Sequence, residues 1–288
     1  MEQTPSPIGA TAAPDPNVFE MAAIDDRVLP LSVNALDVRG RAVRLGPALD
    51  AILSRHDYPP AVRNLVGQAV VLASLLGTAM KFKGRFILQT NTDGPVDMVV
   101  ADFTTPNHLR GYARFDADKL AAVGDDPAAL IGSGYLALTV DQGEHMQRYQ
   151  GIVPLEGGDL IAAAHTYFQQ SEQIPTKLKV AVAESLERGG GSSWRAGGLM
   201  VQHLPPEGGK PRDLDPGDGS IDARADDPAW EEAVALVDTV EDHELVDPTL
   251  ASERLLYRLF HERGVHVFDG LDVIDQCHCS GDRLKAAI

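Results

Sequence analysis

The stretch PAVRNLVGQAVVLASLLGTAMKFK, from Pro60 to Lys83, carries the strongest helix signal in the chain. Few charges interrupt its apolar residues, which cover nearly the whole circumference of a helix: Val62, Leu65, Val66, Ala69, Val70, Leu72, Ala73, Leu76, Ala79 and Met80. A helix that is apolar all round is buried on all sides. We therefore predict that residues 60–83 form the central helix of the core.

Short strand patterns and tight turns surround this helix on both sides. Shorter helices are predicted at residues 48–56 and 160–171, the second with Asp159 as its N-cap. Strands joined by hairpins predict an α+β fold, in which mainly antiparallel sheets pack on the buried central helix. The predicted strands are two within 28–45, with a turn at Arg39-Gly40-Arg41, and single strands at 86–89, 96–103, 110–115, 135–140, 148–153, 178–182 and 198–204.

The composition changes after residue 204. Residues 205–227 are rich in proline, glycine and acid, which is typical of a linker or surface loop. Asp227-Pro228 and Asp247-Pro248 each place an N-cap aspartate before a proline, so each predicts a helix start. The first helix presents Trp230; the second presents Leu255 and Leu259 and ends at Gly264, before a short strand at 265–268. We expect a disordered extension (1–18), an α+β core (19–204), an acidic linker (205–227), a helical linker subdomain (228–268) and a partial redox or zinc domain (269–288).

The overall charge excludes several classes of function. The chain has 288 residues, 44% of them hydrophobic, and a net charge of −17. Such an excess of acid repels nucleic-acid phosphates and anionic membranes, so we expect neither as a partner. Residues 1–16 lack the lysine, arginine and apolar run of a signal peptide, and the sequence has no run of about 18 apolar residues. We predict a cytoplasmic protein.

The common catalytic motifs do not fit. His261 and His266 stand five residues apart with a glycine between them, whereas a zinc-protease helix needs histidines four apart. Residues 132–137 resemble a dinucleotide loop but lead into a strand pattern rather than a helix. We predict that the protein is not an enzyme; a zinc hydrolase using His261 or His266 is kept as an alternative.

The two cysteines of the chain are Cys277 and Cys279. Thiols this close cannot join distant parts of a fold, so their use is local. Their spacing suits a disulfide, and two thiolates also make half of a tetrahedral zinc site. The alternative is a pair of exposed thiols with no function. His261, His266 or a second chain would have to complete a zinc site.

Many short motifs in order resemble the heat shock protein 33 family of redox-regulated chaperones, from about Leu36 to Arg283. The strongest pieces lie between residues 143 and 198: Gly143-Glu144, Arg148-Tyr149-Gln150-Gly151-Ile152-Val153, Leu155-Glu156-Gly157, Tyr167-Phe168, Ser171-Glu172-Gln173-Ile174-Pro175-Thr176 and Ala196-Gly197-Gly198. A supporting piece near the C-terminal end is Cys277-His278-Cys279-Ser280. Each motif alone is weak, but the set is specific.

The resemblance implies an ATP-independent holdase that binds unfolded client proteins and forms a homodimer when active. In this family a Cys-x-Cys and a later Cys-x-x-Cys bind zinc. Oxidation forms disulfides, unfolds the tail and linker, and exposes apolar surface. Cys277 and Cys279 match the first pair, as metal ligands and as redox thiols. Trp230 and the leucine-rich helix would be part of the covered surface.

The sequence departs from the family pattern because it ends at Ile288, before a Cys-x-x-Cys. We therefore expect a truncated chain whose zinc binding is weak or absent and which is active without an oxidant. The acidic segment 205–227 resembles an insertion. A second alternative is a constitutive protein-binding module whose cysteines are incidental.

Overall fold

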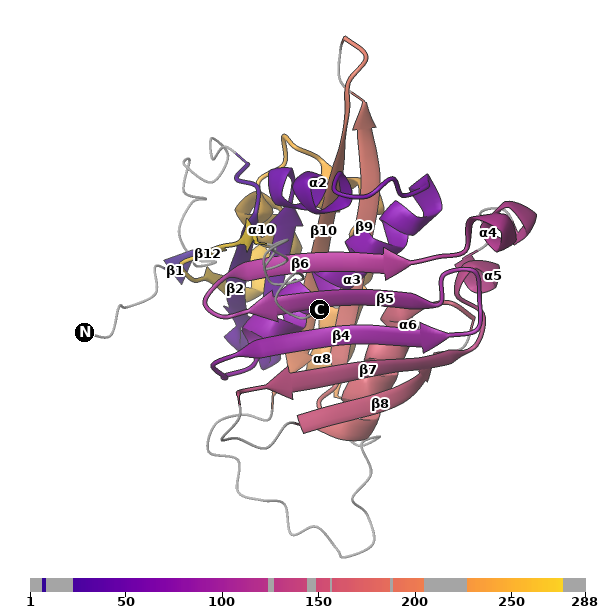
Figure 1. Ribbon diagram of the computed structural model, residues 1–288. Coiled ribbons are helices and arrows are strands. Elements are labelled where there is room, and N and C mark those ends of the chain that lie inside the picture. The colour runs from indigo at the N-terminus through magenta and orange to yellow at the C-terminus, as the bar shows by residue number, and fades with distance from the viewer. Residues whose placement is uncertain are drawn as a thin grey trace, which may run out of the picture.

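The computed structural model describes residues 7–8, 23–123, 127–143, 149–155, 157–186, 189–204 and 227–276. Helix α3 (Pro60–Ala79) lies at the centre, between two β-sheets (Figure 1). Pro60 occupies its first turn, and Met80 ends it by adopting an extended conformation (φ −95°, ψ 148°). Its central residues are almost fully buried. The prediction of a buried central helix is confirmed, with an end four residues earlier than the pattern indicated.

The larger sheet has seven strands in the order β1-β11-β2-β3-β10-β9, with β12 also paired to β2, and every pairing in it is antiparallel. Long central strands adjoin α3, while short pieces from the two ends of the chain line one edge. The strands are β1 (Pro7–Ile8), β2 (Arg27–Val33), β3 (Val38–Leu45), β9 (Thr176–Leu186), β10 (Ser192–His203), β11 (Val265–Val267) and β12 (Leu271–Asp272).

The second sheet has six strands in the order β13-β6-β5-β4-β7-β8. It lies in front of α3 in Figure 1, and its strands run across the direction of β9 and β10. Only the short β13 pairs in parallel, with β6. The strands are β4 (Arg85–Thr92), β5 (Met98–Thr104), β6 (His108–Arg114), β7 (Gly134–Asp141), β8 (Tyr149–Leu155) and β13 (Ile274–Asp275). The α+β fold with mainly antiparallel sheets is therefore confirmed.

Shorter helices complete the chain. Asp159 caps α6 as predicted, because its side chain accepts hydrogen bonds from the amides of Ile161 and Ala162 at 2.8 and 3.0 Å. Helices α4, α5 and α9 were not predicted from the sequence. The helical elements are η1 (Asn34–Leu36), α2 (Pro47–Leu53), α4 (Ala117–Val123), α5 (Pro127–Ile131), α6 (Leu160–Tyr167), the π-helical turn η2 (Phe168–Glu172), α8 (Pro228–Asp238), α9 (Asp242–Val246), α10 (Ser252–Phe260) and η3 (His261–Arg263).

The buried side chains form two separate clusters. The larger surrounds α3 and fills the space between the sheets. The smaller lies on the opposite face of the seven-stranded sheet, where α8, α9 and α10 pack. Among the described residues, α3 is the one helix long and apolar enough to suit a membrane, but 72% of its most apolar window is buried inside the protein. Its hydrophobicity is explained by the core.

Two local predictions are wrong. The turn in residues 28–45 falls at η1 and Asp37, which has φ 49°, and not at Arg39-Gly40-Arg41. Gly40 is inside β3, where a Cβ would lie 2.4 Å from the carbonyl oxygen of Met200, so glycine allows close strand packing. The second error is Asp247-Pro248. Asp247 is the C-cap of α9, and α10 begins later, at Ser252.

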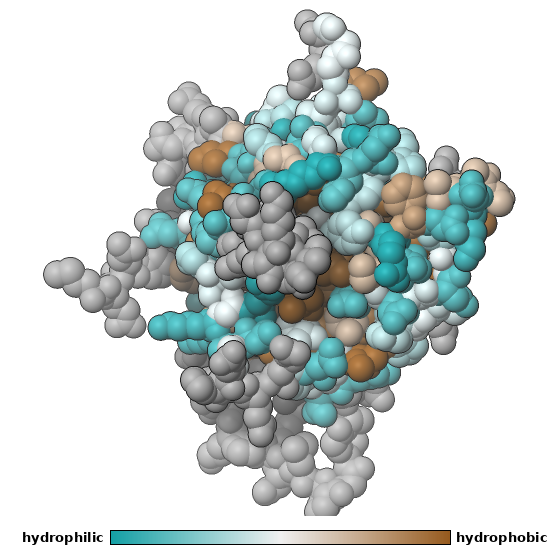
Figure 2. Space-filling model, in the orientation of Figure 1, coloured by the Kyte–Doolittle hydropathy of each residue, from teal (hydrophilic) through white to brown (hydrophobic). Residues whose placement is uncertain are grey.

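The outer face of the six-stranded sheet is mixed in character. Figure 2 shows hydrophobic residues lying among hydrophilic ones on this side of the molecule. Tyr112, Tyr135 and Ile152 are exposed there, on β6, β7 and β8. Pro7–Ile8 form β1 within the predicted N-terminal extension; the rest of residues 1–18, and residues 205–226 of the predicted acidic linker, lie outside the described residues.

Candidate functional site

Residues 227–264, called here the helical segment, cover the outer face of the seven-stranded sheet, which is the face turned away from α3. The apolar residues of the segment that pack against that face are Trp230, Ala233, Val237, Val240, Leu245, Leu255, Leu256, Leu259 and Phe260. The sheet supplies Leu31, Val33, Val38, Ala42, Ala181, Leu199 and Val201. Trp230, Leu255 and Leu259 are only 7%, 3% and 7% exposed, so the predicted covered surface is confirmed as a packed interface.

One end of this interface is an aromatic stack. The imidazole of His203, the last residue of β10, stacks on the indole of Trp230, with ring centroids 5.7 Å apart. Asp227 caps α8 through a 2.8 Å hydrogen bond from the amide of Ala229. Its carboxylate lies 3.9 Å from Nε2 of His203. The end of β10 and the start of α8 are therefore held together by the contacts that His203 makes with Trp230 and Asp227.

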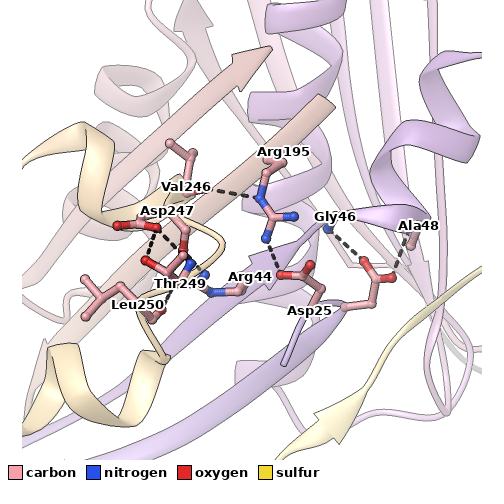
Figure 3. Close-up of polar contacts among 10 residues, drawn as sticks. Asp25, Arg44, Gly46, Ala48, Arg195, Val246, Asp247, Thr249 and Leu250 are labelled. Carbon is pink, nitrogen blue, oxygen red and sulfur yellow. Dashed lines mark hydrogen bonds and ion pairs between the residues drawn. The ribbon is translucent and has the colours of Figure 1, made fainter. Parts of the chain in front are cut away.

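Two arginines of the sheet bind the helical segment where α9 ends and the chain continues to α10 (Figure 3). Arg44 of β3, only 2% exposed, donates to the carbonyl oxygens of Asp247 and Leu250. Arg195 of β10 donates from Nε to the carbonyl of Val246 at 3.1 Å and pairs with Asp25. Burial lowers the pKa of Arg44, and Asp25 opposes that change. The carbonyls at the C-terminal end of α9 are thereby satisfied by cations, as the helix dipole favours.

Two lysines of β9 bind oxygen atoms at the C-terminal end of α8 and just after it. Lys179 donates to the carbonyl of Asp238 at 3.2 Å and also to that of Val240. Lys177 pairs with the carboxylate of Asp238 at 2.7 Å. Arg44, Lys177, Lys179 and Arg195 are called here the cation frame. Because three of them bind main-chain oxygens, much of this recognition does not depend on the side chains of the helical segment.

Gly197 of β10 permits the closest approach of the segment to the sheet. A Cβ at this position would lie 2.1 Å from the carbonyl oxygen of Leu245, in α9. No side chain can occupy that space without moving α9, since the obstacle is main chain. Its neighbour Gly198 faces the other core, where a Cβ would lie 2.5 Å from Cγ1 of Val71.

The helical segment is also tied together internally. Arg258 of α10 binds the carboxylate of Glu244 in α9, and Arg263 binds Glu232 of α8 at 2.6 Å. The hydrogen bond from Arg258 lowers the pKa of Glu244 to about 2, with partial burial opposing it and the Glu241 amide assisting it. The segment can therefore move as a unit only if these pairs persist.

Residues 265–276, called here the strap, connect the helical segment to the cysteines. β11 and β12 pair with β2, and β13 then pairs with β6 of the other sheet. Asp275 forms an ion pair with Arg55, and Val273 is 2% exposed. The amides of Ile274 and Gln276 donate to Asn107 and Leu109 at 3.0 and 3.1 Å. The strap thus joins both sheets immediately before residue 277.

The predicted metal and redox residues, Cys277 and Cys279, lie outside the described residues. His261 is exposed and stacks on Tyr257, and His266 lies on β11. Within the described residues, no group of three or more histidines and acids could hold a metal ion. The structure therefore gives the hydrolase alternative no catalytic metal site in that part of the chain.

Comparison with known proteins identifies the family. The family model described as Hsp33 protein matches residues 26–288. A 33 kDa chaperonin of Caulobacter vibrioides is 43% identical over 277 residues, covering 94% of this chain and 85% of that protein. The chain belongs to the Hsp33 family.

Other Hsp33-related proteins agree with this assignment. A 33 kDa chaperonin of Nitrosococcus oceani is 38% identical over 251 residues, covering 87% of this chain and 76% of the relative. The crystal structure of the 33 kDa chaperonin from Thermotoga maritima superposes with a TM-score of 0.67 at 22% identity, covering 91% of this chain and 84% of that one. The latter supports the fold.

For this Hsp33 chain, sequence reasoning found the apolar cover but missed the cation frame and Gly197. A signal for the lysines was present: Lys177 and Lys179 alternate with Leu178 and Val180, which places both lysines on one face of a strand. Arg44 and Arg195 carried no such signal, because their partners are main-chain carbonyls that no pattern reveals.

Proposed function

We propose that this protein is a redox-regulated, ATP-independent holdase, which binds unfolded or oxidatively damaged proteins and prevents their aggregation. The observation that carries the proposal is the second apolar cluster. It is formed by a contiguous piece of chain, residues 227–264, lying on a sheet that is already complete without it. A regulated binding surface requires a covering element that can leave it without opening the main core, and the helical segment, referred to below as the cover, is such an element.

Cys277 and Cys279 would be the redox switch. Two thiolates one residue apart suit zinc, which would hold both as thiolates when bound, and these residues would supply two of its four ligands. With peroxide as oxidant, the two thiols lose two protons and two electrons and form one disulfide, while the peroxide is reduced to water. The new bond changes the local geometry directly beside the strap.

The strap would transmit that change. β13 is only two residues long and is held by its pairing with β6, by the main-chain hydrogen bonds from Ile274 and Gln276, and by the Arg55–Asp275 ion pair. Loss of β13 and β12 would leave β11 as the one strand of the strap still paired with β2, so the helical segment would depend on its own contacts with the sheet face. The outer face of the seven-stranded sheet and the apolar side of the segment would then both become available to clients.

Clients would bind through sequence-tolerant apolar contacts, and the active form would be a homodimer in the cytoplasm. The protein would have no catalytic activity, as expected of a chaperone. The competing proposal is a constitutive binding module, in which Cys277 and Cys279 have no role.

The test is suppression of aggregation of a heat-unfolded client by the full chain, reduced and after peroxide treatment, with Cys277→Ser/Cys279→Ser as the comparison. We expect oxidation to raise the activity of the unsubstituted chain and to leave the serine variant unchanged. Absence of suppression in both redox states would refute the holdase proposal. Equal activity in both states and in the variant would favour the constitutive module.

A further inference from the structure

The cation frame lies on the covered sheet face, beside the residues of β10 that face the helical segment. The β9–β10 register places Lys179 beside Leu199 and Lys177 beside Val201, and the β3–β10 register places Arg44 beside Gly197. Arg195 lies on the same face, two residues before Gly197. In a chain of net charge −17, this face therefore combines apolar residues with concentrated positive charge.

Outside the helical segment, Arg195 of the cation frame pairs with Asp25 and keeps that partner when the segment leaves. The other partners of the frame are oxygen atoms at or just after the ends of α8 and α9. They are the carbonyls of Asp238, Val240, Val246, Asp247 and Leu250 and the carboxylate of Asp238. When the helical segment leaves, the four cations lose these partners. A ligand that replaces the segment gains most if it brings its own negatively charged or carbonyl oxygens around an apolar centre.

The covering sequence has that character. Residues 228–247, which make these contacts except the one at Leu250, contain no lysine or arginine. Apolar residues such as Trp230 and Val237 are interspersed with acids: Glu231, Glu232, Asp238, Glu241, Asp242, Glu244 and Asp247. Arginines occur in the segment only further on, in and after α10. The chain thus covers its own positive face with an acidic, apolar stretch.

We propose that the uncovered face selects among unfolded chains, and prefers segments whose apolar residues are flanked by glutamate or aspartate over segments flanked by lysine. This inference rests on the proposed holdase function and specifies the class of client. It runs against the net charge of −17, which by itself would repel acidic clients. The preference therefore has to come from the local frame.

The expected preference is modest because Lys177 and Lys179 are half-buried and would become more exposed. Exposed ion pairs contribute little individually, so four cations together should favour a glutamate-flanked segment by about tenfold at low salt. Added salt should reduce that ratio, since screening acts on exposed charges.

The experiment compares two dye-labelled unstructured peptides with the same leucine-rich centre, one flanked by glutamates and one by lysines. Binding to the full chain is measured by anisotropy, before and after peroxide treatment. Opening of the cover changes both apparent affinities by the same factor, so the ratio of the two affinities reports charge selection alone. This matters because substitutions in the frame are also expected to loosen the cover.

The test variant is Lys177→Gln/Lys179→Gln, which should lower the ratio about threefold. The matched control is Lys81→Gln/Lys83→Gln, which removes the same net charge from exposed positions in the α3–β4 connection and should leave the ratio unchanged. Should the test variant misfold, the salt dependence of the ratio in the unsubstituted chain gives an independent readout.

The outcomes separate this inference from the holdase proposal. Suppression of client aggregation with equal affinity for the two peptides, or with a ratio that the control variant lowers as much as the test variant, would overturn the charge preference and leave the holdase standing. Binding of neither peptide, with no suppression of aggregation in either redox state, would overturn both.

Discussion

The imidazole of His203 and the indole of Trp230 lie 21° from parallel, with ring centroids 5.7 Å apart. His203 ends the last long strand of the sheet, and Trp230 lies in the first turn of the helical segment. Both side chains are buried, and residues 204–229 separate them in sequence. The stack is therefore a contact made by docking of the segment, and it reports whether the cover is closed.

Trp230→Ala should open the cover without an oxidant. Removing a buried tryptophan costs about 3 kcal/mol or more, and most of the cost falls on docking because the ring contacts the sheet across the interface. A shift of that size changes the open–closed equilibrium by about a hundredfold. The reduced variant should suppress client aggregation more than the reduced unsubstituted chain.

Ile152→Ala is the control for Trp230→Ala, because Ile152 is 59% exposed on the outer face of the other sheet. It should leave both aggregation suppression and thermal stability nearly unchanged. A reduced Trp230→Ala protein that suppresses aggregation no more than the reduced unsubstituted chain, while proteolysis shows residues 227–264 released, would mean that the uncovered face does not bind clients.

Gly197→Ala should release α9 by a purely steric effect. The new Cβ would lie 2.1 Å from the carbonyl oxygen of Leu245, so α9 must move away from β10 at a cost of about 1–3 kcal/mol. Alanine is otherwise tolerated in a strand. Limited proteolysis should cut within residues 227–264 sooner, while the midpoint of thermal unfolding of the core changes little.

The neighbouring Gly198→Ala provides the comparison for that variant. Its Cβ would press on Val71 of α3 and so would strain the main core. We expect a lower melting temperature and no selective cleavage of the helical segment. The same proteolytic pattern in both variants would show that the cover and the core unfold together.

The sequence predicted the parts of this fold that depend on apolar pattern. The all-round apolar residues of α3, the hairpin β7–β8 and the caps at Asp159 and Asp227 are where the patterns placed them. Asp247 misled because aspartate before proline suits a turn as well as a helix start: its carboxylate accepts from the amide and hydroxyl of Thr249.

The interface was predictable on its apolar side only. That Trp230 and the leucine-rich helix carrying Leu255 are covered was implied by the resemblance to the Hsp33 family, and the apolar residues of the two predicted helices agree with it. Arg44 and Arg195 bind main-chain carbonyls of residues about 50 to 200 positions away, which periodicity does not encode. Of the strap, the strand predicted at 265–268 is found as β11, whereas β12 and β13 were not predicted, since strands of two residues leave no pattern.

Oxidation, or removal of zinc by a chelator, should first release the strap. The amide of Ile274 donates to the carbonyl of Asn107, just before β6, and that of Gln276 donates to the carbonyl of Leu109 in β6. Hydrogen exchange at these two amides should therefore accelerate before exchange at the amides of β4 or β5. Hydrogen exchange with residue resolution checks this. The Cys277→Ser/Cys279→Ser variant should exchange fast from the start and show no further change with peroxide.

Asp275→Asn should have a related but smaller effect, because it removes the ion pair with Arg55 and keeps the main-chain pairing of β13. Exchange at Ile274 should rise severalfold in the reduced chain. Unchanged protection of Ile274 and Gln276 after full oxidation of both thiols would show that the cysteines are not coupled to the sheet through the strap.

Acid should loosen the helical segment through Glu244. Its pKa in the folded protein is about 2, against an ordinary value of 4.5, because Arg258 hydrogen-bonds the ionised carboxylate. A lowered pKa stabilises the folded form fully above pH 4.5, and that contribution is lost as the pH falls from 4.5 towards 2. Since the pair joins α9 to α10, the loss of stability should appear first in the helical segment.

The fluorescence of Trp230, measured in a Trp194→Phe background, should report release of the helical segment in this pH range. Glu244→Gln should be less stable than the parent at neutral pH by an amount that vanishes near pH 2. Glu231→Gln, which removes the same charge from an exposed position of α8, should follow the parent curve. A stability difference between the Glu244→Gln protein and its parent that persists unchanged down to pH 2 would exclude the carboxylate as the titrating group.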